Sequence, residues 1–421
     1  MSEKNAIYAQ SGGVTAVINA TACGVIKTAR LHTDRINKLY AARNGIIGVL
    51  AEQLFDTSLE SEQDLNKLMY TPAGAFGSCR YKLKDHSVDY ERLLAVFKAH
   101  NIHYFFYNGG GDSQDTAYKI ARLGSERDFP ITCIGIPKTV DNDLPFTDNC
   151  PGFGSVAKYI AISTLEAGFD VASMASSSTK VFILEVMGRH TGWIAAASGL
   201  AGQTKAEPPH IILFPEIAFE PQKFLAAVKN CVRNYGFSVI VVSEGLRNVA
   251  GTFLATDGLT DSFGHAQLGG VAPLIAQLVK KELGYKNHWA IADYLQRAAR
   301  HIASAVDVEQ AYALGQAAVN LALQGHNAIM PVIKRECDSP YLWTISHVDL
   351  AKVANQEKKM PKEFISADGF SITEACRGYL APLIHGEAYP PFQHGLPTYG
   401  RLRNQLVKQK LTVYEPIATV Y

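Results

Sequence analysis

Three short turns in the sequence combine residues that could bind a phosphate and move a proton. Each follows an apolar run: Asn108-Gly109-Gly110-Gly111-Asp112-Ser113, Pro137-Lys138-Thr139-Val140-Asp141-Asn142-Asp143 and Glu185-Val186-Met187-Gly188-Arg189. Glycines let backbone N–H groups approach a phosphate closely, and a helix that starts there adds partial positive charge. The first turn alone fits a strand-to-helix connection without a ligand equally well, so it decides nothing by itself.

The second turn places two carboxylates two residues apart, with a lysine beside them. Asp141 is suited to act as a general base, Asp143 to face a metal ion, and Lys138 to neutralise a transferred phosphate. The third turn ends in Arg189, whose guanidinium is a forked cation. A solvated loop and a surface arginine at a helix start are the plain alternatives for these two turns.

The first turn does not match the common nucleotide-binding signatures. It lacks the Gly-Lys-Ser/Thr of a Walker A loop and the spacing of a GxGxxG fingerprint. A dinucleotide site also requires an acidic residue at the end of the next strand, where Pro137-Lys138 stands instead. These departures weaken an interpretation as a dehydrogenase.

These turns need a scaffold, and the surrounding sequence has apolar runs typical of buried strands. Strands are expected at residues 6–9, 104–107, 131–136, 180–186, 210–214, 237–242 and 328–333, and helices at 16–28, 114–122 and 302–323. Short continuous apolar strands are buried on both faces, which indicates an α/β protein with helices on both sides of parallel sheets. Ligands of such sheets bind at the carboxyl ends of strands, where all three turns fall.

Composition limits the class of protein further. The chain has 421 residues, which favours two α/β domains, and its 47% hydrophobic content excludes a disordered chain. Lys and Arg number 40 against 39 Asp and Glu, a net charge of +1 that argues against nucleic acid or a membrane surface as a partner. Seven scattered cysteines without a CxxC pair, and no signal-like or membrane-spanning segment, predict a cytoplasmic protein.

Taken in order along the chain, the turns and several further segments resemble the phosphofructokinase family over roughly the first 330 residues. The matching segments are Ser11-Gly12-Gly13, Gly77-Ser78-Cys79-Arg80, Gly109-Gly110-Gly111-Asp112-Ser113, the turn from Pro137 to Asp143, Met187-Gly188-Arg189, Ser243-Glu244-Gly245 and Tyr294-Leu295-Gln296-Arg297. The resemblance implies two Rossmann-like three-layer domains with a C-terminal extension. It assigns residues 1–153 plus 298–345 to the phosphoryl donor, 154–297 to the sugar phosphate and 346–421 to the extension.

Two positions indicate the phosphoryl donor. ATP-using members usually carry Gly where Asp112 and Lys138 stand, so the chain looks like the pyrophosphate-dependent branch of the family. Asp112 would repel a nucleotide α-phosphate at close range, and Lys138 would give pyrophosphate a cation. The implied reaction is a reversible step of glycolysis, in which pyrophosphate and fructose 6-phosphate give fructose 1,6-bisphosphate and phosphate.

The resemblance also implies a role for each matching residue. Asp141 would accept the proton of the sugar 1-hydroxyl, while Lys138 and Arg189 neutralise the transferred phosphoryl group. The residues expected to bind pyrophosphate are Gly13, Arg80, Gly110, Asp112, Ser113 and Lys138. The residues expected to bind the sugar phosphate are Thr139, Asp141, Lys180, Met187, Gly188, Arg189, Glu244, Tyr294 and Arg297.

The family further implies a cofactor and an assembly. Mg²⁺ is expected, but the Asp that usually helps to hold it is Gly111 here, so its ligands are expected to be Asp112 and Asp143, completed by water or pyrophosphate oxygens. Lys180 stands where the family has a cation that reaches in from a neighbouring subunit, which implies a homodimer or homotetramer with shared active sites. Lys82 and Lys84 could add charge beside Arg80 or form a solvated basic stretch.

Other interpretations stay open at this point. An ATP-dependent phosphofructokinase differs only in its donor. An NAD or lipid kinase would share the Gly-Gly-Asp type of turn, but the Met187-Gly188-Arg189 segment argues against it. A non-catalytic regulatory subunit of a heteromeric phosphofructokinase is expected to lose the acidic turn, which is intact here in Asp141 and Asp143.

Overall fold

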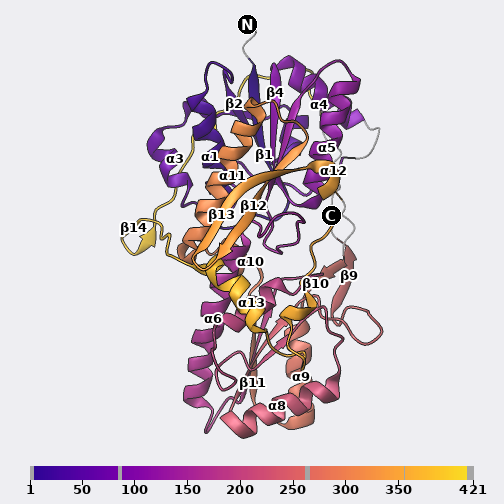
Figure 1. Cartoon of the computed structure of the whole chain (residues 1–421), viewed down its shortest axis with the longest axis vertical. Helices are drawn as coiled ribbons and strands as arrows, with labels where there is room; N and C mark the ends of the chain where they lie inside the picture. Colours follow the sequence, from indigo (N-terminus) through magenta and orange to yellow (C-terminus); the bar gives the residue numbers. More distant parts are fainter. Residues whose placement is uncertain (1–3, 84–87, 261–265, 355, 415–421) are drawn as a thin grey trace.

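The computed structural model describes residues 4–83, 88–260, 266–354 and 356–414, and it divides into an upper and a lower lobe (Figure 1). The upper lobe is built on a seven-stranded sheet. Its strands, in spatial order, are β13 (Tyr341–Asp349), β12 (Ile329–Asp338), β5 (Thr132–Pro137), β4 (Ile102–Gly109), β1 (Asn5–Gln10), β2 (Leu39–Ala42) and β3 (Leu54–Asp56). All neighbouring pairs are parallel except the two at the edges, where β13 and β3 run antiparallel to their neighbours.

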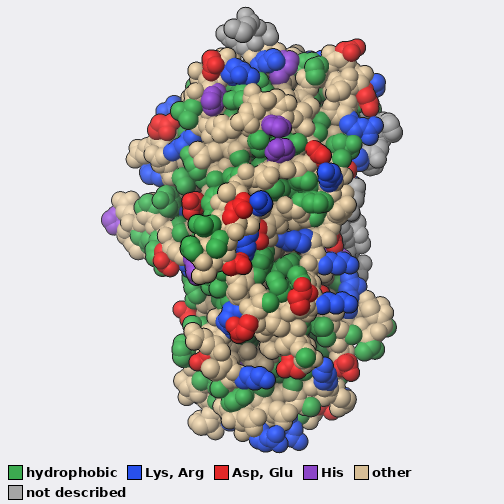
Figure 2. Space-filling model, viewed as in Figure 1, with side chains coloured by type: hydrophobic (Ala, Val, Ile, Leu, Met, Phe, Trp, Pro, Cys, Tyr) green, Lys and Arg blue, Asp and Glu red, His purple; other side chains and the backbone are tan. Residues whose placement is uncertain are grey.

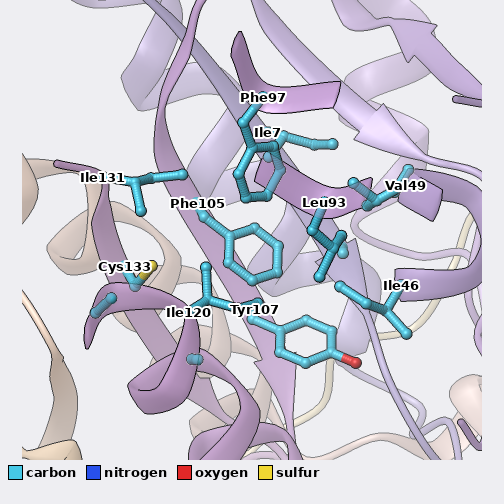
Figure 3. Packing of buried hydrophobic residues seen from close by; sticks show 14 of the residues in the cluster. Ile7, Ile46, Val49, Leu93, Phe97, Phe105, Tyr107, Ile120, Ile131 and Cys133 are labelled. Carbon is cyan, nitrogen blue, oxygen red and sulfur yellow. The ribbon is translucent and has the colours of Figure 1, made fainter. Parts of the chain in front are cut away.

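Helices cover both faces of this upper sheet. They are α1 (Ile18–Leu31), α2 (Ile46–Leu50), α3 (Glu62–Leu68), α4 (Val88–Ala99), α5 (Gly111–Glu126), α11 (Ala305–Leu323) and α12 (Leu350–Val353), with a 3-10 turn η1 (Thr57–Leu59). Along β4, Phe105 and Tyr107 pack under α4 and α5 (Figure 3), whereas Tyr104 and Phe106 pack under α1 and α11. This alternation of apolar side chains on both faces produces three layers.

The lower lobe repeats the arrangement on a smaller, all-parallel sheet. Its strands, in spatial order, are β11 (Asn287–Ile291), β6 (Val181–Val186), β8 (Ser238–Ser243) and β7 (Ile211–Leu213). The elements around it are α6 (Phe153–Met174), α7 (Trp193–Ala197), η2 (Ser198–Leu200), α8 (Pro221–Tyr235), β9 (Thr256–Thr260), β10 (Ala266–Leu268), α9 (Val271–Leu283), α10 (Asp293–Ala298) and η3 (Arg300–Ile302). Leu184 and Val186 of β6 pack against α6, whereas Val181 and Ile183 pack against α8 and α9.

Helix α11 connects the two lobes. It lies so close to α1 that a Cβ on Gly24 would fall 2.2 Å from the carbonyl oxygen of Tyr312, and one on Gly315 would fall 2.2 Å from that of Thr21. The buried carboxylate of Asp307 on α11 accepts hydrogen bonds from the backbone N–H groups of Gly152 and Ser155 at 2.9 Å each. These groups begin α6, so α11 caps the first helix of the lower lobe.

The residues after β13 do not form a separate unit but pack on both lobes. The elements η4 (Lys362–Phe364), α13 (Glu374–Leu380) and η5 (Ala381–Ile384) lie on the lower lobe, and the β14 (Phe392–Gln393) and β15 (Leu396–Pro397) hairpin projects to one side (Figure 1). Residues 399–414, the C-terminal strap, return to the upper lobe. There the carboxylate of Glu60 accepts from the backbone of Arg403 and Asn404, and that of Glu52 accepts from Lys410 and Leu411.

The α/β prediction is confirmed, and the strands and helices expected from the sequence are present with shifted ends. The expected strand at 328–333 is longer, because β12 continues to Asp338 and forms a hairpin with β13. The expected domain boundary after residue 345 therefore lies inside β13, and the division into domains stays a prediction.

Two further features concern the charged side chains of the surface and the apolar length of the helices. Acidic and basic side chains are interspersed over the face shown in Figure 2, as the near-neutral charge balance requires. Within the described ranges, no helix is both long and apolar enough to cross a membrane.

Candidate active site

A cleft of about 630 Å³ lies between the carboxyl ends of the two sheets. The turns that follow β1, β4 and β5 form its upper wall, and those that follow β6 and β8, with α10, form its lower wall. The expected site residues that line it are Gly13, Arg80, Gly110, Asp112, Ser113, Lys138, Thr139, Asp141, Asp143, Met187, Arg189, Glu244, Tyr294 and Arg297. Residues more than 100 positions apart in the sequence thus meet in one place.

The glycines after β1 allow two cations to lie against the backbone. The ammonium Nζ of Lys138 donates to the carbonyl oxygen of Gly13 at 2.7 Å. A Cβ on Gly13 would stand 2.7 Å from Nη1 of Arg297, and Arg80 approaches the same point. A larger residue at this position would have to displace the end of Arg297, whereas glycine lets the main chain and three positive side chains surround one small volume, which suits an anion.

Asp112 lies in the first turn of α5, beside Gly110, at the rim of the upper wall. Its carboxylate accepts from Lys82 Nζ at 3.0 Å, and both side chains are partly exposed. Lys82 is therefore paired with Asp112 while it remains solvated. Lys84 lies outside the described residues. Ser113, one residue further, donates to the hydroxyl of Ser11 at 2.8 Å and so joins the turns after β4 and β1.

The acidic turn after β5 reaches the floor of the cleft. The Thr139 hydroxyl accepts from the backbone N–H of Asp141 at 3.1 Å, and the Thr191 hydroxyl donates to the carbonyl oxygen of Asp141 at 3.2 Å. Burial, strengthened by the nearby charges of Asp143 and Glu244, raises the pKa of Asp141 from 3.8 to about 7. A carboxyl with such a pKa is poised to exchange a proton near neutral pH.

Among the cations of the cleft, Lys138 has a pKa shifted toward neutral, as Asp141 has among the carboxylates. It is only 4% exposed, and burial together with the charge of Arg297 lowers its pKa from 10.5 to about 8. Asp141 and Asp143 act in the opposite direction and favour the charged lysine. The cleft thus holds a lysine and a carboxyl group whose pKa values lie near neutral, an arrangement typical of catalytic sites.

The lower wall carries the carboxylate of Glu244 and two cations, Arg189 and Arg297. Glu244 accepts from the backbone N–H of Gly188 at 3.3 Å, and burial raises the pKa of Glu244 to about 7. Gly188 has a φ of 136° and adjoins the cleft through this bond rather than lining it. The guanidinium of Arg297 lies 3.9 Å from the ring centre of Tyr294, which is 61% exposed.

Lys180 is the one expected site residue that the structure places elsewhere. It precedes β6, whereas Met187 follows that strand, so about 20 Å of extended chain separates Lys180 from the cleft. Its ammonium bonds to the carbonyl oxygen of Ala175. Within one chain, Lys180 does not reach the cleft. Its participation in the active site of a neighbouring subunit stays a prediction.

The donor set of the cleft fits a divalent cation in part. Asp141, Asp143 and Glu244 all have raised pKa values, chiefly through burial and, for Asp141, through the other two carboxylates as well, so added positive charge would stabilise their ionised forms. No three His, Cys, Asp or Glu side chains converge as a metal cage in the part of the chain that the structure describes. Oxygens of substrate or water would therefore have to complete the coordination, which Mg²⁺ commonly accepts.

Several lining residues were not expected from the sequence. Asp293 adjoins Tyr294, His190 follows Arg189, and Glu357 comes from the polar segment after β13. Gln296, inside a matching segment, accepts from the backbone N–H of Met187 at 3.3 Å. Position next to a matching motif could have indicated the first two and Gln296, but no local signal marks Glu357.

Comparison with known proteins places this cleft in context. The profile of the family described as Phosphofructokinase matches residues 5–322. The chain is 62% identical to a pyrophosphate–fructose 6-phosphate 1-phosphotransferase of Halomonas elongata, over 99% of this chain and 100% of that protein. It is 62% identical to one of Methylococcus capsulatus, over 98% and 99%. A crystal structure of pyrophosphate-dependent phosphofructokinase from Marinobacter aquaeolei superposes with a TM-score of 0.91 at 63% identity, over 97% of this chain and 99% of that one.

Proposed function

The chain belongs to the phosphofructokinase family, and from that premise we propose that it is a pyrophosphate-dependent 6-phosphofructokinase. It transfers a phosphoryl group reversibly between pyrophosphate and the 1-hydroxyl of fructose 6-phosphate. The observation that carries the proposal is the donor wall, where the buried Lys138 bonds to Gly13 and the Asp112 carboxylate occupies the rim. The wall attracts a small, highly charged donor and disfavours the α-phosphate of a nucleotide.

In the forward direction, Asp141 accepts the proton of the sugar 1-hydroxyl as that oxygen attacks one phosphorus of pyrophosphate. The bond from that phosphorus to the bridging oxygen breaks, and phosphate leaves with the bridging oxygen. Lys138 and Arg189 neutralise the charge on the transferred group, as the cleft position of both side chains allows. Thr139 orients the phosphoryl group through its hydroxyl.

The remaining residues bind the two substrates. Gly13, Arg80, Gly110, Ser113 and Lys138 hold pyrophosphate on the upper wall. On the lower wall, Glu244, Met187 and Gly188 bind the sugar hydroxyls, and Arg297 with Tyr294 binds the 6-phosphate. Of the carboxylates in the cleft, we assign Asp143 and Asp112 to Mg²⁺, and Asp112 would exchange its contact with Lys82 for the metal. When bound, the metal supplies positive charge to the pyrophosphate oxygens.

The proposal includes a homo-oligomer with shared active sites in the cytoplasm. Two observations support the oligomer: Lys180 lies away from its own cleft, and the edge strand β11 leads into an apolar surface. Trp289, Ile291 and Leu295 on that surface are 47%, 40% and 67% exposed. The free thiols of the described cysteines suit a reducing compartment such as the cytoplasm.

A donor-by-acceptor activity matrix on the purified chain tests the proposal. Pyrophosphate, ATP and GTP would each be offered with fructose 6-phosphate and with other sugar phosphates, in the presence of Mg²⁺. We expect turnover with pyrophosphate and fructose 6-phosphate at least 100-fold above that with either nucleotide. Faster turnover with ATP would replace the proposal by an ATP-dependent kinase, and inactivity with every donor would favour a regulatory subunit.

A further inference from the structure

The residue between the two carboxylates of the acidic turn is held from behind by the C-terminal part of the chain. Asn142 is fully buried and has a φ of 55°, a left-handed conformation that Asn tolerates better than most residues. Because Asn142 separates Asp141 from Asp143, its backbone conformation determines how the two carboxylates project into the cleft. A contact that fixes the conformation of Asn142 therefore also fixes the directions of the two carboxylates.

Lys358 is the first of two residues that fix Asn142. Its ammonium Nζ donates to Oδ1 of Asn142 at 3.1 Å, and its backbone N–H donates to the carbonyl oxygen of Asp143 at 2.6 Å. The same ammonium donates to the carbonyl oxygens of Thr147 and Asp148 at 3.2 and 2.8 Å, and it lies 5.4 Å from the ring centre of Trp193. One half-buried lysine thus bonds along the whole loop that follows β5.

Within the described residues, the ammonium of Lys358 forms no ion pair. Each hydrogen-bond acceptor given above for its ammonium is a neutral amide oxygen, yet burial disfavours the charged lysine. Asp143 and Asp148 lie close enough to favour the charged form. Such a placement is costly for stability alone, which points to a role for the lysine in the shape and charge of the acidic turn.

Tyr379 on α13 is the second residue that fixes Asn142. Its hydroxyl accepts from Nδ2 of Asn142 at 2.9 Å and donates to the carbonyl oxygen of Asp148 at 2.6 Å. The backbone N–H of Cys150 completes the set by donating to Oδ1 of Asn142 at 3.0 Å. The amide of Asn142 is therefore held on both its oxygen and its nitrogen.

We propose that Lys358 and Tyr379 are positioning residues for phosphoryl transfer, which hold Asn142 and through it the carboxylates of Asp141 and Asp143 in their reactive arrangement. The inference rests on the proposed function and extends it to the segment after β13. This segment also brings Glu357, the neighbour of Lys358, to the wall of the cleft. The C-terminal residues are then part of the catalytic apparatus rather than an accessory to it.

Steady-state kinetics of three full-length variants with pyrophosphate and fructose 6-phosphate test the inference. Lys358→Met removes the ammonium but keeps much of the side-chain volume, Tyr379→Phe removes one hydroxyl, and Lys359→Met is the matched control, because Lys359 is exposed. We expect kcat to fall about 10- to 100-fold in Lys358→Met and about 3- to 10-fold in Tyr379→Phe, with both KM values within about threefold of wild type. Lys359→Met should keep the wild-type kcat.

The double variant separates positioning from general weakening of the fold. Because both residues act through Asn142, the loss of kcat in the double variant should be smaller than the product of the single losses. Independent, multiplicative losses, or a wild-type kcat in Lys358→Met, would overturn the positioning role. If Lys358→Met does not fold, Tyr379→Phe decides by the loss of kcat expected for it, with thermal melting to verify folding, and a wild-type kcat in Tyr379→Phe would overturn the inference.

The controls distinguish this inference from the proposed function. An inactive wild-type chain with pyrophosphate would remove the premise and the inference together. An active wild type beside an equally active Lys358→Met would overturn only the inference.

Discussion

At the scale of single residues, the cleft holds an acid and a base whose pKa values lie close to neutral. Burial raises the pKa of Asp141 to about 7 and lowers that of Lys138 to about 8. Proton acceptance requires ionised Asp141, and binding of an anionic donor requires charged Lys138. Both conditions hold together in the pH interval between these values.

The substitution Asp141→Asn tests the role of Asp141 as the base, through kcat and through the pH dependence of kcat/KM. We expect kcat to fall about 100- to 10,000-fold, because the amide cannot accept the proton of the sugar hydroxyl. In the wild type, kcat/KM should decrease as pH falls below about 7, where Asp141 gains a proton, and as pH rises above about 8, where Lys138 loses one. A stopped or coupled assay of phosphate release across pH 5–10 measures both limbs, at about constant ionic strength. Retention of the acidic limb in the residual activity of Asp141→Asn would contradict the assignment of the base.

The same substitution has a stability effect with a defined sign. The pKa of Asp141 is higher in the folded chain than its ordinary value of 3.8, so ionisation costs stability increasingly from that value up to about 7. At pH 8, Asp141→Asn should therefore be more stable than wild type by roughly 1–3 kcal/mol, and the gain should shrink as pH falls toward 4. Thermal melting in EDTA without pyrophosphate gives the comparison.

The choice of phosphoryl donor also depends on single residues, Asp112 and Lys138. Replacing both Asp112 and Lys138 by Gly should lower kcat/KM for pyrophosphate by about 100-fold or more, because a cation is lost from the donor wall, and should allow turnover of ATP. Asp128→Gly is the matched control, since Asp128 is exposed and has a φ of 50° that glycine adopts easily. Kinetics with each donor measure the change. Unaltered pyrophosphate kinetics in the double variant would reject the role of these two positions.

Most of the candidate site could be predicted from the sequence because its residues follow strands directly. Asp112, Asp141 and Arg189 each stand within a few positions of a buried apolar run, and the ends of parallel strands meet at one edge of a sheet. Glu357 and Lys358 could not be predicted in this way. They reach the site through the packing of a segment about 200 residues after the acidic turn, and no periodicity marks them.

At the scale of elements, the close contact of α1 and α11 determines how the lobes are joined. Gly24 and Gly315 allow the two helix backbones to touch, and α11 then presents Asp307 to the start of α6. This helix pair therefore links the sheet of the upper lobe to the first helix of the lower one.

The substitution Gly24→Ala tests whether the close contact of α1 and α11 stabilises the fold. The added Cβ would fall 2.2 Å from the carbonyl oxygen of Tyr312, a backbone atom that cannot turn aside, so the helices must separate. We expect a loss of about 1–3 kcal/mol in the free energy of unfolding, measured by denaturant titration. Gly378→Ala in α13 is the control: no atom lies within 4 Å of its added Cβ, and alanine favours helix, so stability should stay equal or rise. Equal stability of the two variants would contradict the close-packing argument.

As with the residues of the site, some strands could be predicted from the sequence and others could not. Strands such as β4 and β6 could be predicted because each contains a continuous apolar run, 104–107 and 181–184, as expected of strands buried on both faces. The β12–β13 hairpin could not be predicted beyond residue 333, because its outer half is only partly buried and residues 334–338 of β12 are mostly charged. Its pairing is decided by the partner strand rather than by its own sequence.

At the scale of the whole molecule, the position of Lys180 predicts that one subunit completes the site of another. Co-expression of Lys180→Ala with Asp141→Ala chains tests this expectation. Each variant alone should lose most of its activity, whereas a mixed dimer retains one intact site, so random assembly restores about a quarter of wild-type activity. Differently tagged chains allow the mixed species to be purified. Mixed dimers without activity would show that the sites are not shared.

The alternation of the chain between the lobes, described above for α6, α11 and the C-terminal strap, has a consequence for synthesis. The upper lobe begins with β1 but needs α11 to cover one face of its sheet, β12 to extend it, and residues 399–414 to bind Glu52 and Glu60. Helix α11 and strand β12 leave the ribosome only after residues 153–302 of the lower lobe. The apolar face formed by Tyr8, Phe106 and Ile136 is therefore covered by α1 without α11 while about 170 further residues emerge. The core of the lower lobe in turn needs Met360, Cys376 and Leu383, so neither lobe can complete its core until the C-terminal part of the chain is made.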